Sequence, residues 1–233
     1  LVKIYVRSRE LGVTPSLYTL AEANQPVDSI FGILRMDLSA RPAVAALSNY
    51  FGQISGGEYL FRDKSDEEIC VFCYWRNGAP VLIAWDPSGE KTLSFDTDVS
   101  VQDLYGNSLG SMCEVKLQQQ PVYITGVERA WAEEKGKAEI LRMYAAFIEK
   151  YKTGLPEDFL TAAEELQSKI QAGLPDNDVV ERHYELGLEL MQAKGQTLFL
   201  PENTMMWYSY HQIGSLMAVM ASLDAEGQTG TAA

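Results

Sequence analysis

In the C-terminal half of the chain, apolar side chains recur at helical spacing. Each run places them on one broad face, as in an amphipathic helix, and the runs lie at 138–151, 159–170, 179–193 and 204–223. Glycine and proline separate the runs near 154–156, 173–175 and 195–201. Because these residues break helices, the pattern predicts four helices in 138–223. The Gly/Thr/Ala-rich stretch 225–233 is predicted to be a disordered tail.

The middle of the chain has the pattern of short strands. Short, largely apolar stretches, several alternating with polar residues, lie between turn residues, at 59–62, 68–76, 80–85, 92–95, 99–101, 113–117 and 122–124. The pair Asn77-Gly78 is a strong signal for a two-residue hairpin. The segment 86–89, Asp-Pro-Ser-Gly, has the chemistry of a tight turn. Evenly spaced short strands of this kind predict an antiparallel two-sheet sandwich over 58–125.

The first 57 residues predict a helix, a strand, a loop and a second helix. The first helix is predicted to end at Gly12, and its apolar face consists of Val2, Tyr5, Val6 and Leu11. Residues 16–21 are mostly apolar, as in a buried parallel strand. Arg-Pro at 41–42 opens the second helix, with Ser39 as its expected cap. One strand between two helices cannot bury both of its faces, so this segment is expected to pack against further partners.

Several motifs of the first half occur in a family-specific order. Residues 29–57, SIFGILRMDLSARPAVAALSNYFGQISGG, contain the line FG-L-(turn)-RPA-x-A. Further along, the chain reads V-L-x-x-W at 81–85, V-x-D-L-x-G-N at 101–107 and P-V-Y-I at 121–124. Together these elements resemble the end of a clan-A glycoside hydrolase. In that family the RPA line joins the eighth barrel strand to the last helix, and a small β-sandwich follows.

The resemblance and the helical pattern together imply an α+β multidomain fold. Residues 1–57 would form the last β/α elements of a (β/α)8 barrel, and 58–126 would form an antiparallel β-sandwich. Residues 127–224 would be an α-helical domain outside the resemblance, followed by the tail. The chain has no initiator Met and no signal peptide, and it starts inside a helical pattern, which suggests a processed or fragmentary chain.

The resemblance also locates the chemistry. The two catalytic carboxyls of a clan-A enzyme lie at the ends of barrel strands four and seven, which places both before Leu1. Residues 16–22 would be the eighth strand. Glu22 follows it at the barrel mouth and, with Tyr18 and Asn24, would contact the carbohydrate substrate. The alternative for Glu22 is an ordinary solvated loop glutamate. The implied partner is an N-terminal barrel portion, supplied by missing residues or by a companion chain.

Composition and the remaining motifs exclude several other chemistries. A net charge of −13 and a pI near 4.6 argue against nucleic acid, and no stretch is long and apolar enough to span a bilayer. There is no phosphate-binding loop or dinucleotide fingerprint, so no cofactor is expected. Cys70 and Cys73 lie three apart in a predicted strand, so their thiols cannot share a zinc ion. Trp75 and Trp85 would stack on sugars or, as we favour, pack in the core.

Two functions from different classes follow. The first is the C-terminal portion of a glycoside hydrolase, which completes the barrel while the catalytic acids lie elsewhere. The alternative is a non-catalytic binding or assembly module that docks a partner protein or a carbohydrate. If residues 1–57 pack against another chain or against missing residues, the glycoside hydrolase hypothesis is favoured. If they fold back onto the helical half as a closed domain, the binding-module hypothesis is favoured.

Overall fold

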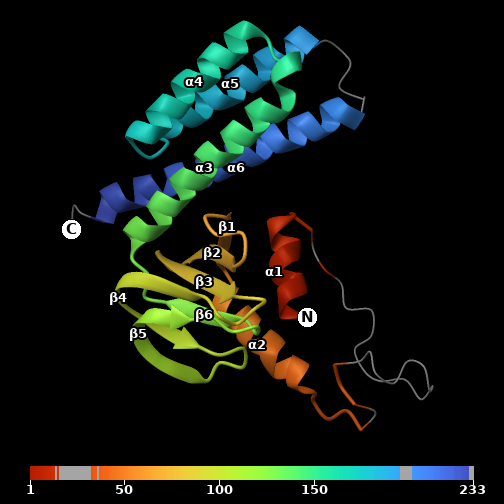
Figure 1. Ribbon diagram of the computed structural model, residues 1–233, viewed down its shortest axis with the longest axis vertical. Helices are drawn as coiled ribbons and strands as arrows, with labels where there is room; N and C mark the ends of the chain where they lie inside the picture. Colours follow the sequence, from red (N-terminus) through yellow and green to blue (C-terminus); the bar gives the residue numbers. More distant parts are fainter. Residues whose placement is uncertain (14, 16–32, 36, 195–200, 231–233) are drawn as a thin grey trace. The chain divides into compact units, whose positions relative to one another are not determined.

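The computed structural model describes all residues except 14, 16–32, 36, 195–200 and 231–233 (Figure 1). It divides into two compact units, Leu1–Ala132, called unit 1, and Glu133–Ala233, called unit 2. Unit 1 combines two helices with a β-sheet, and unit 2 is helical. The fold is therefore α+β, as the sequence predicts.

The described strands of unit 1 are antiparallel and join in one open sheet; the strand predicted at 16–21 lies outside the described residues. In chain order they are β1 Glu58–Asp63, β2 Cys70–Arg76, β3 Ala79–Trp85, β4 Thr92–Gln102, β5 Ser108–Lys116 and β6 Val122–Thr125. Their order in the sheet is β1-β2-β3-β6-β4-β5. The sequence predicts two sheets, and the structure differs because β6 pairs with both β3 and β4. Thr125 lies opposite Val81 on one side and Ser100 on the other, which links the two groups of strands.

The hairpin predicted at Asn77-Gly78 is confirmed. Strands β2 and β3 pair up to Arg76 and Ala79, so the loop between them has two residues. Both loop residues have positive φ, 52° at Asn77 and 78° at Gly78. Two positive φ angles are the requirement of a type I′ turn, whose twist matches that of the strands it joins. Local turn chemistry thus sets the register of the two central strands.

Helices α1 (Val2–Glu10) and α2 (Pro42–Ile54) cover one face of the sheet (Figure 1). Their buried side chains and alternate residues of β2 and β3 share one apolar core, made of Val2, Val6, Ala46, Leu47, Tyr50, Ile54, Cys70, Phe72, Tyr74, Val81, Ile83, Trp85 and Tyr123. Helix α2 begins at Pro42, as expected. Ser39 is not its cap, because Arg41 occupies that position and the Ser39 hydroxyl accepts a hydrogen bond from Arg35. Leu11 is exposed rather than part of the buried face.

The four predicted helices are present as α3 Arg129–Tyr151, α4 Glu157–Ala172, α5 Asn177–Lys194 and α6 Pro201–Gly230, with a 3-10 turn at Lys152–Gly154. All of them belong to unit 2 except the first four residues of α3, which belong to unit 1. Helix α3 begins well before residue 138 and continues through Gly136, a residue that costs a helix only about 1 kcal/mol. Helix α6 runs to Gly230, into the stretch predicted as a disordered tail. Of the described helices, none combines the length and hydropathy needed to cross a membrane.

A buried carboxylate organises the turn between β3 and β4. Asp86 is 1% exposed and accepts hydrogen bonds from the Ser88 hydroxyl at 2.6 Å, the Ser88 N–H at 2.8 Å, the Glu90 N–H at 2.8 Å and the Lys91 N–H at 2.9 Å. The bond from the Ser88 hydroxyl and the three N–H bonds hold the pKa of Asp86 well below its usual range. The turn predicted at 86–89 is therefore built around an ionised carboxylate.

We expect Asp86→Asn to lower the midpoint of thermal unfolding at pH 7 by about 5 °C, because an amide cannot accept all four hydrogen bonds. A carboxylate with a lowered native pKa stabilises the fold above its unfolded pKa of about 3.9 and loses this contribution as the pH falls further. The difference between wild type and variant should therefore shrink below about pH 4. Asp98→Asn, at an exposed position of β4, is the matched control. A difference that stays constant down to pH 2 would contradict this role.

Candidate functional site

The site residues predicted from the sequence, Tyr18, Glu22 and Asn24, lie outside the described residues. The structure does describe the two helices on either side of them, α1 and α2. These helices, the contacts that hold them, and the surface they present define the candidate site.

Helix α1 is held on the sheet by cationic side chains. The Lys3 ammonium donates to the Gln119 carbonyl at 2.6 Å and lies 5.3 Å from the centre of the Trp85 ring. The Arg7 guanidinium lies 5.1 Å from the centre of the Phe72 ring. Such cation–π contacts contribute about 0.5–2 kcal/mol each. They fix one side of α1 against the sheet, so its opposite side faces outward.

Helix α2 is held at its C-terminal end and along its side. The Arg76 guanidinium donates to the carbonyls of Gly52 at 2.6 Å and Gln53 at 2.8 Å, which satisfies carbonyls that the end of a helix leaves free. The Gln53 amide donates to the Gln102 side chain at 2.8 Å. The Asn49 amide donates at longer range to the Asp103 carbonyl, at 3.4 Å. Helix α2 therefore has a fixed orientation.

The turn Asp-Leu-Tyr-Gly-Asn at 103–107, one of the motifs that carry the resemblance, lies against α2. The Asp103 carboxylate accepts the N–H groups of Tyr105 and Asn107, both at 2.8 Å. Burial would raise its pKa, but these bonds and that from the Asn107 amide lower it overall. Gly106 has φ +91° and approaches the Asn49 side chain so closely that a Cβ would lie 2.9 Å from its oxygen. Glycine is required there on both counts.

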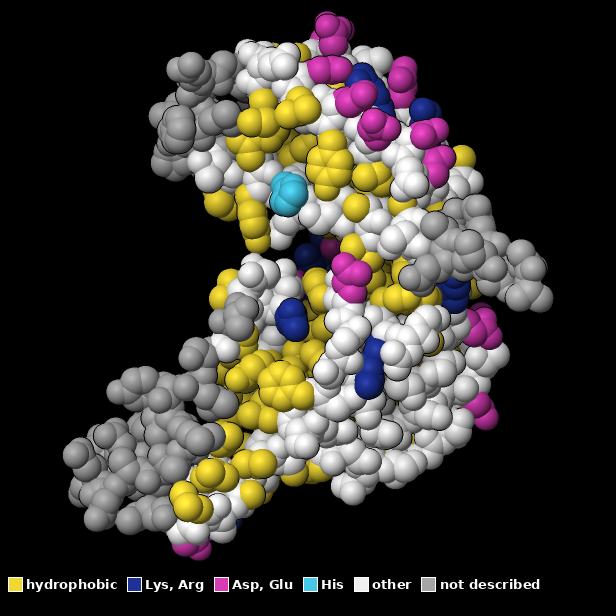
Figure 2. Space-filling view, turned by 180° about the vertical axis from the view of Figure 1, so that it is seen from behind, with side chains coloured by type: hydrophobic (Ala, Val, Ile, Leu, Met, Phe, Trp, Pro, Cys, Tyr) yellow, Lys and Arg dark blue, Asp and Glu magenta, His cyan; other side chains and the backbone are white. Residues whose placement is uncertain are grey.

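The outward side of the two helices carries exposed apolar residues. Leu1 (47% exposed), Ile4 (60%) and Leu11 (59%) follow helical spacing along α1 and its flanks, and Phe51 (48%) lies on α2. Tyr5 links the helices, with its ring centre 5.6 Å from that of Phe51. Hydrophobic side chains also gather on unit 1 in Figure 2. We call Leu1, Ile4, Leu11 and Phe51 the α1–α2 face.

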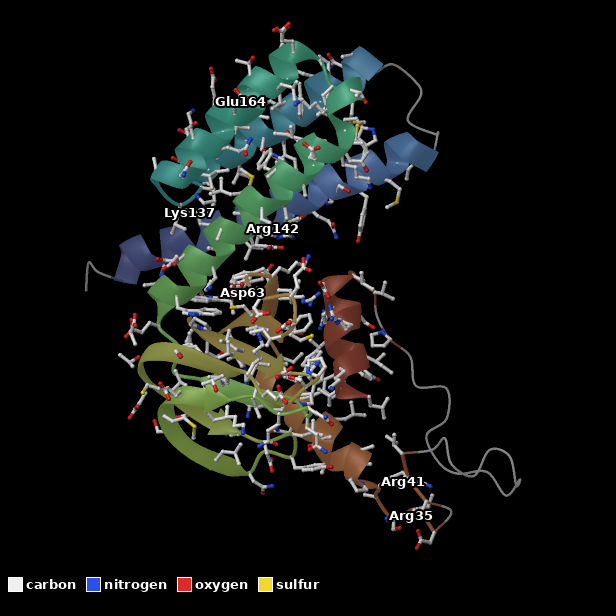
Figure 3. All side chains as sticks on the ribbon, in the orientation of Figure 1. Arg35, Arg41, Asp63, Lys137, Arg142 and Glu164 are labelled. Atoms are coloured by element: carbon white, nitrogen blue, oxygen red, sulfur yellow. The ribbon has the colours of Figure 1, made fainter. Side chains whose placement is uncertain are left out.

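The N-terminal end of α2 carries two arginines, Arg35 and Arg41 (Figure 3). Arg35 donates to the Ser39 hydroxyl and to the Ala40 carbonyl at 2.9 Å, across a small loop that Leu34 and Ala40 close by a β-bridge. The loop is part of the FG-L-(turn)-RPA line. The Arg35 side chain holds the turn that leads into Pro42.

The aromatic and cysteine motifs of the sheet serve packing. Trp75 and Trp85 are 8% and 4% exposed, so the interpretation as core residues is confirmed. Cys70 and Cys73 are free thiols on opposite faces of β2. Only Cys70 belongs to the core beneath α1 and α2. Burial raises the pKa of the Cys73 thiol, which keeps it protonated and unreactive. The described residues contain no group of His, Cys, Asp and Glu side chains that could hold a metal ion.

Unit 2 holds a buried histidine that the sequence analysis did not identify as a structural centre. His183 Nδ1 forms a short hydrogen bond with the Tyr144 hydroxyl, and Nε2 lies 3.2 Å from the Tyr210 carbonyl. The imidazole stacks on the Tyr210 ring with centres 4.0 Å apart. Burial lowers the pKa of His183 to about 4, so it is neutral at pH 7. A glycine in the middle of the predicted helix 204–223 was the sequence feature that could have indicated this packing. Gly214 lacks a Cβ and so leaves room for the His183 imidazole.

We expect Gly214→Ala to destabilise unit 2 by about 1–2 kcal/mol. The new Cβ would lie 2.8 Å from His183 Cδ2, and this overpacking outweighs the gain of about 1 kcal/mol that Ala brings to a helix. Urea unfolding followed by far-UV circular dichroism measures the change. Gly173→Ala is the control, because nothing lies within 4 Å of its Cβ position. Equal stabilities of the two variants would show that the His183 packing is loose.

Comparisons with family models, with curated proteins and with solved structures found no match to this chain. The likeness to clan-A glycoside hydrolases therefore rests on the sequence motifs alone.

Proposed function

We propose that this chain is the C-terminal portion of a clan-A-like glycoside hydrolase. Residues 1–57 complete a (β/α)8 barrel, the sheet of unit 1 supports that barrel from the side, and the two catalytic carboxyls lie outside the chain. The observation that carries the proposal is the α1–α2 face. Helices fixed on one side and apolar on the other are suited to lie between two layers, as the outer helices of a barrel do when an accessory domain covers them.

The contacts between motifs support this assignment. The helix opened by Arg41-Pro42 and the turn at 103–107 carry two different motifs of the resemblance. In the structure Asn49 of that helix donates to the carbonyls of Asp103 and Leu104, at 3.4 and 3.5 Å. Two motifs far apart in the sequence thus form one packed element, as expected if they were inherited together.

The carboxyls of the described residues fit a supporting role. Glycoside hydrolysis needs two carboxyls about 5–9.5 Å apart across the scissile bond. The two buried carboxyls among the described residues already have hydrogen-bond partners within the chain. Asp86 organises a turn, and both oxygens of Glu139 accept hydrogen bonds from Arg142 at 2.6 Å. Glu22, Tyr18 and Asn24 are proposed to border the carbohydrate, so loss of Glu22 would weaken substrate binding rather than abolish the reaction.

The first test is the activity of the chain without any companion. We expect the purified 233-residue chain to hydrolyse none of a panel of aryl glycosides, because it supplies at most one barrel strand and neither catalytic acid. Turnover above background that disappears in Glu22→Gln would contradict the proposal, since it would place the catalytic machinery within this chain.

The second test uses the whole protein or complex as it occurs naturally. We expect Ile4→Lys with Phe51→Lys to lower its glycosidase activity at least tenfold. Each apolar side chain buried at an interface contributes about 1.5–3 kcal/mol, and about 1.4 kcal/mol is a factor of ten. Thr97→Lys, at an exposed position of β4 outside the α1–α2 face, is the matched control and should leave activity unchanged.

Circular dichroism of each variant checks that unit 1 remains folded. Natural material in which the α1–α2 face binds another protein but no glycoside is hydrolysed would favour the alternative, an assembly module. Activity that survives the double substitution would contradict the role given to the face.

A further inference from the structure

Unit 2 has its own exposed apolar surface, formed by α5 and α6. Tyr184 and Leu188 of α5 are 39% and 59% exposed, and Met205 and Tyr208 of α6 are 53% and 45% exposed. We call these four residues the α5–α6 patch. Large aromatic, Leu and Met side chains that stay exposed together are typical of protein-binding surfaces rather than of ordinary solvated helices.

The patch is continuous across the two helices because they approach closely. A Cβ on Gly214 would lie 3.1 Å from Tyr184 Cε1, so glycine lets the ring of α5 rest on α6. The Tyr184 and His211 rings are 6.4 Å apart. The stack of His183 on Tyr210 holds the same two helices together from inside. Hydrophobic side chains surround a surface histidine on this part of the molecule in Figure 2. The patch therefore extends over both helices.

The surroundings of the patch are acidic. Exposed Glu181, Glu185 and Glu189 lie on the same side of α5 as Tyr184 and Leu188, one turn apart along the helix. Arg182 pairs with Glu185 at 3.3 Å and Glu189 at 2.9 Å, so this rim keeps a net negative charge. Residues 133–233 carry sixteen acidic and eight basic side chains, a net charge of −8, whereas 204–223 carry none of either sign. The patch is therefore an uncharged strip bordered by carboxylates.

We propose that the α5–α6 patch binds a basic amphipathic helix of a partner protein. The apolar face of such a helix covers Leu188, Met205 and the two tyrosines, and its Lys and Arg side chains meet the carboxylates of α5. Exposed Met adapts its shape to the helix that it contacts. A second copy of this chain is a poor occupant, because it carries a net charge of −13 and would place a second acidic rim against the first.

The test is fluorescence anisotropy of a labelled 18-residue peptide of Leu and Lys, with all Leu on one helical face, titrated with the 233-residue chain. We expect saturable binding that Leu188→Ser with Met205→Ser weakens at least tenfold. Both side chains are more than half exposed, so the variant keeps its fold and its charge. The same peptide with Glu in place of Lys should not bind, and binding should weaken as ionic strength rises.

The matched control removes charge elsewhere. Glu164 and Glu165 are exposed on α4, away from the patch in sequence, and Glu164 is labelled in Figure 3. Glu164→Gln with Glu165→Gln should change the dissociation constant less than threefold. An equal or larger loss in this control than in the patch variant would show diffuse attraction to an acidic surface and overturn the proposal. So would absence of saturable binding, or a dimer of the chain that Leu188→Ser with Met205→Ser abolishes.

Discussion

The arrangement of unit 1 depends on how α2 is held. Its inner side buries Ala46, Leu47, Tyr50 and Ile54 against the sheet, and each large side chain contributes about 1.5–3 kcal/mol. Arg76 satisfies the carbonyls at its C-terminal end, and Asn49 joins it to the turn at 103–107. These contacts hold α2 in the orientation that leaves Phe51 48% exposed. The α2 part of the α1–α2 face is therefore a consequence of how the helix is anchored.

The two units differ in where their polar side chains lie relative to the apolar core. Unit 1 keeps its charged groups at the margins of the core, as with Arg7 over Phe72 and Asp86 in its turn. Unit 2 places a neutral histidine among tyrosines, where both ring nitrogens find partners. Because a partly satisfied buried histidine would cost several kcal/mol, this network favours one packing of α5 on α6. The same packing aligns the residues of the α5–α6 patch.

The features predictable from the sequence are those decided by local chemistry. Asn77-Gly78 sets a hairpin by its own φ angles, Pro42 opens a helix, and glycine–proline breaks separate the helices of unit 2. The features that escaped prediction depend on distant partners. The single sheet arises because β6 pairs on both edges, and Ser39 loses the cap position because Arg35 engages it. The predicted subsite residues, Tyr18, Glu22 and Asn24, lie outside the described residues, so they stay a prediction from the resemblance.

The central claim is that the α1–α2 face packs against the remainder of a barrel. Photo-crosslinking from positions 4 and 51 in the whole natural protein or complex, read by mass spectrometry, measures it most directly. The account predicts cross-links from both positions to segments that alternate strand and helix and that carry the catalytic carboxyls. Cross-links confined to unit 2, or none at all from either position, would contradict it.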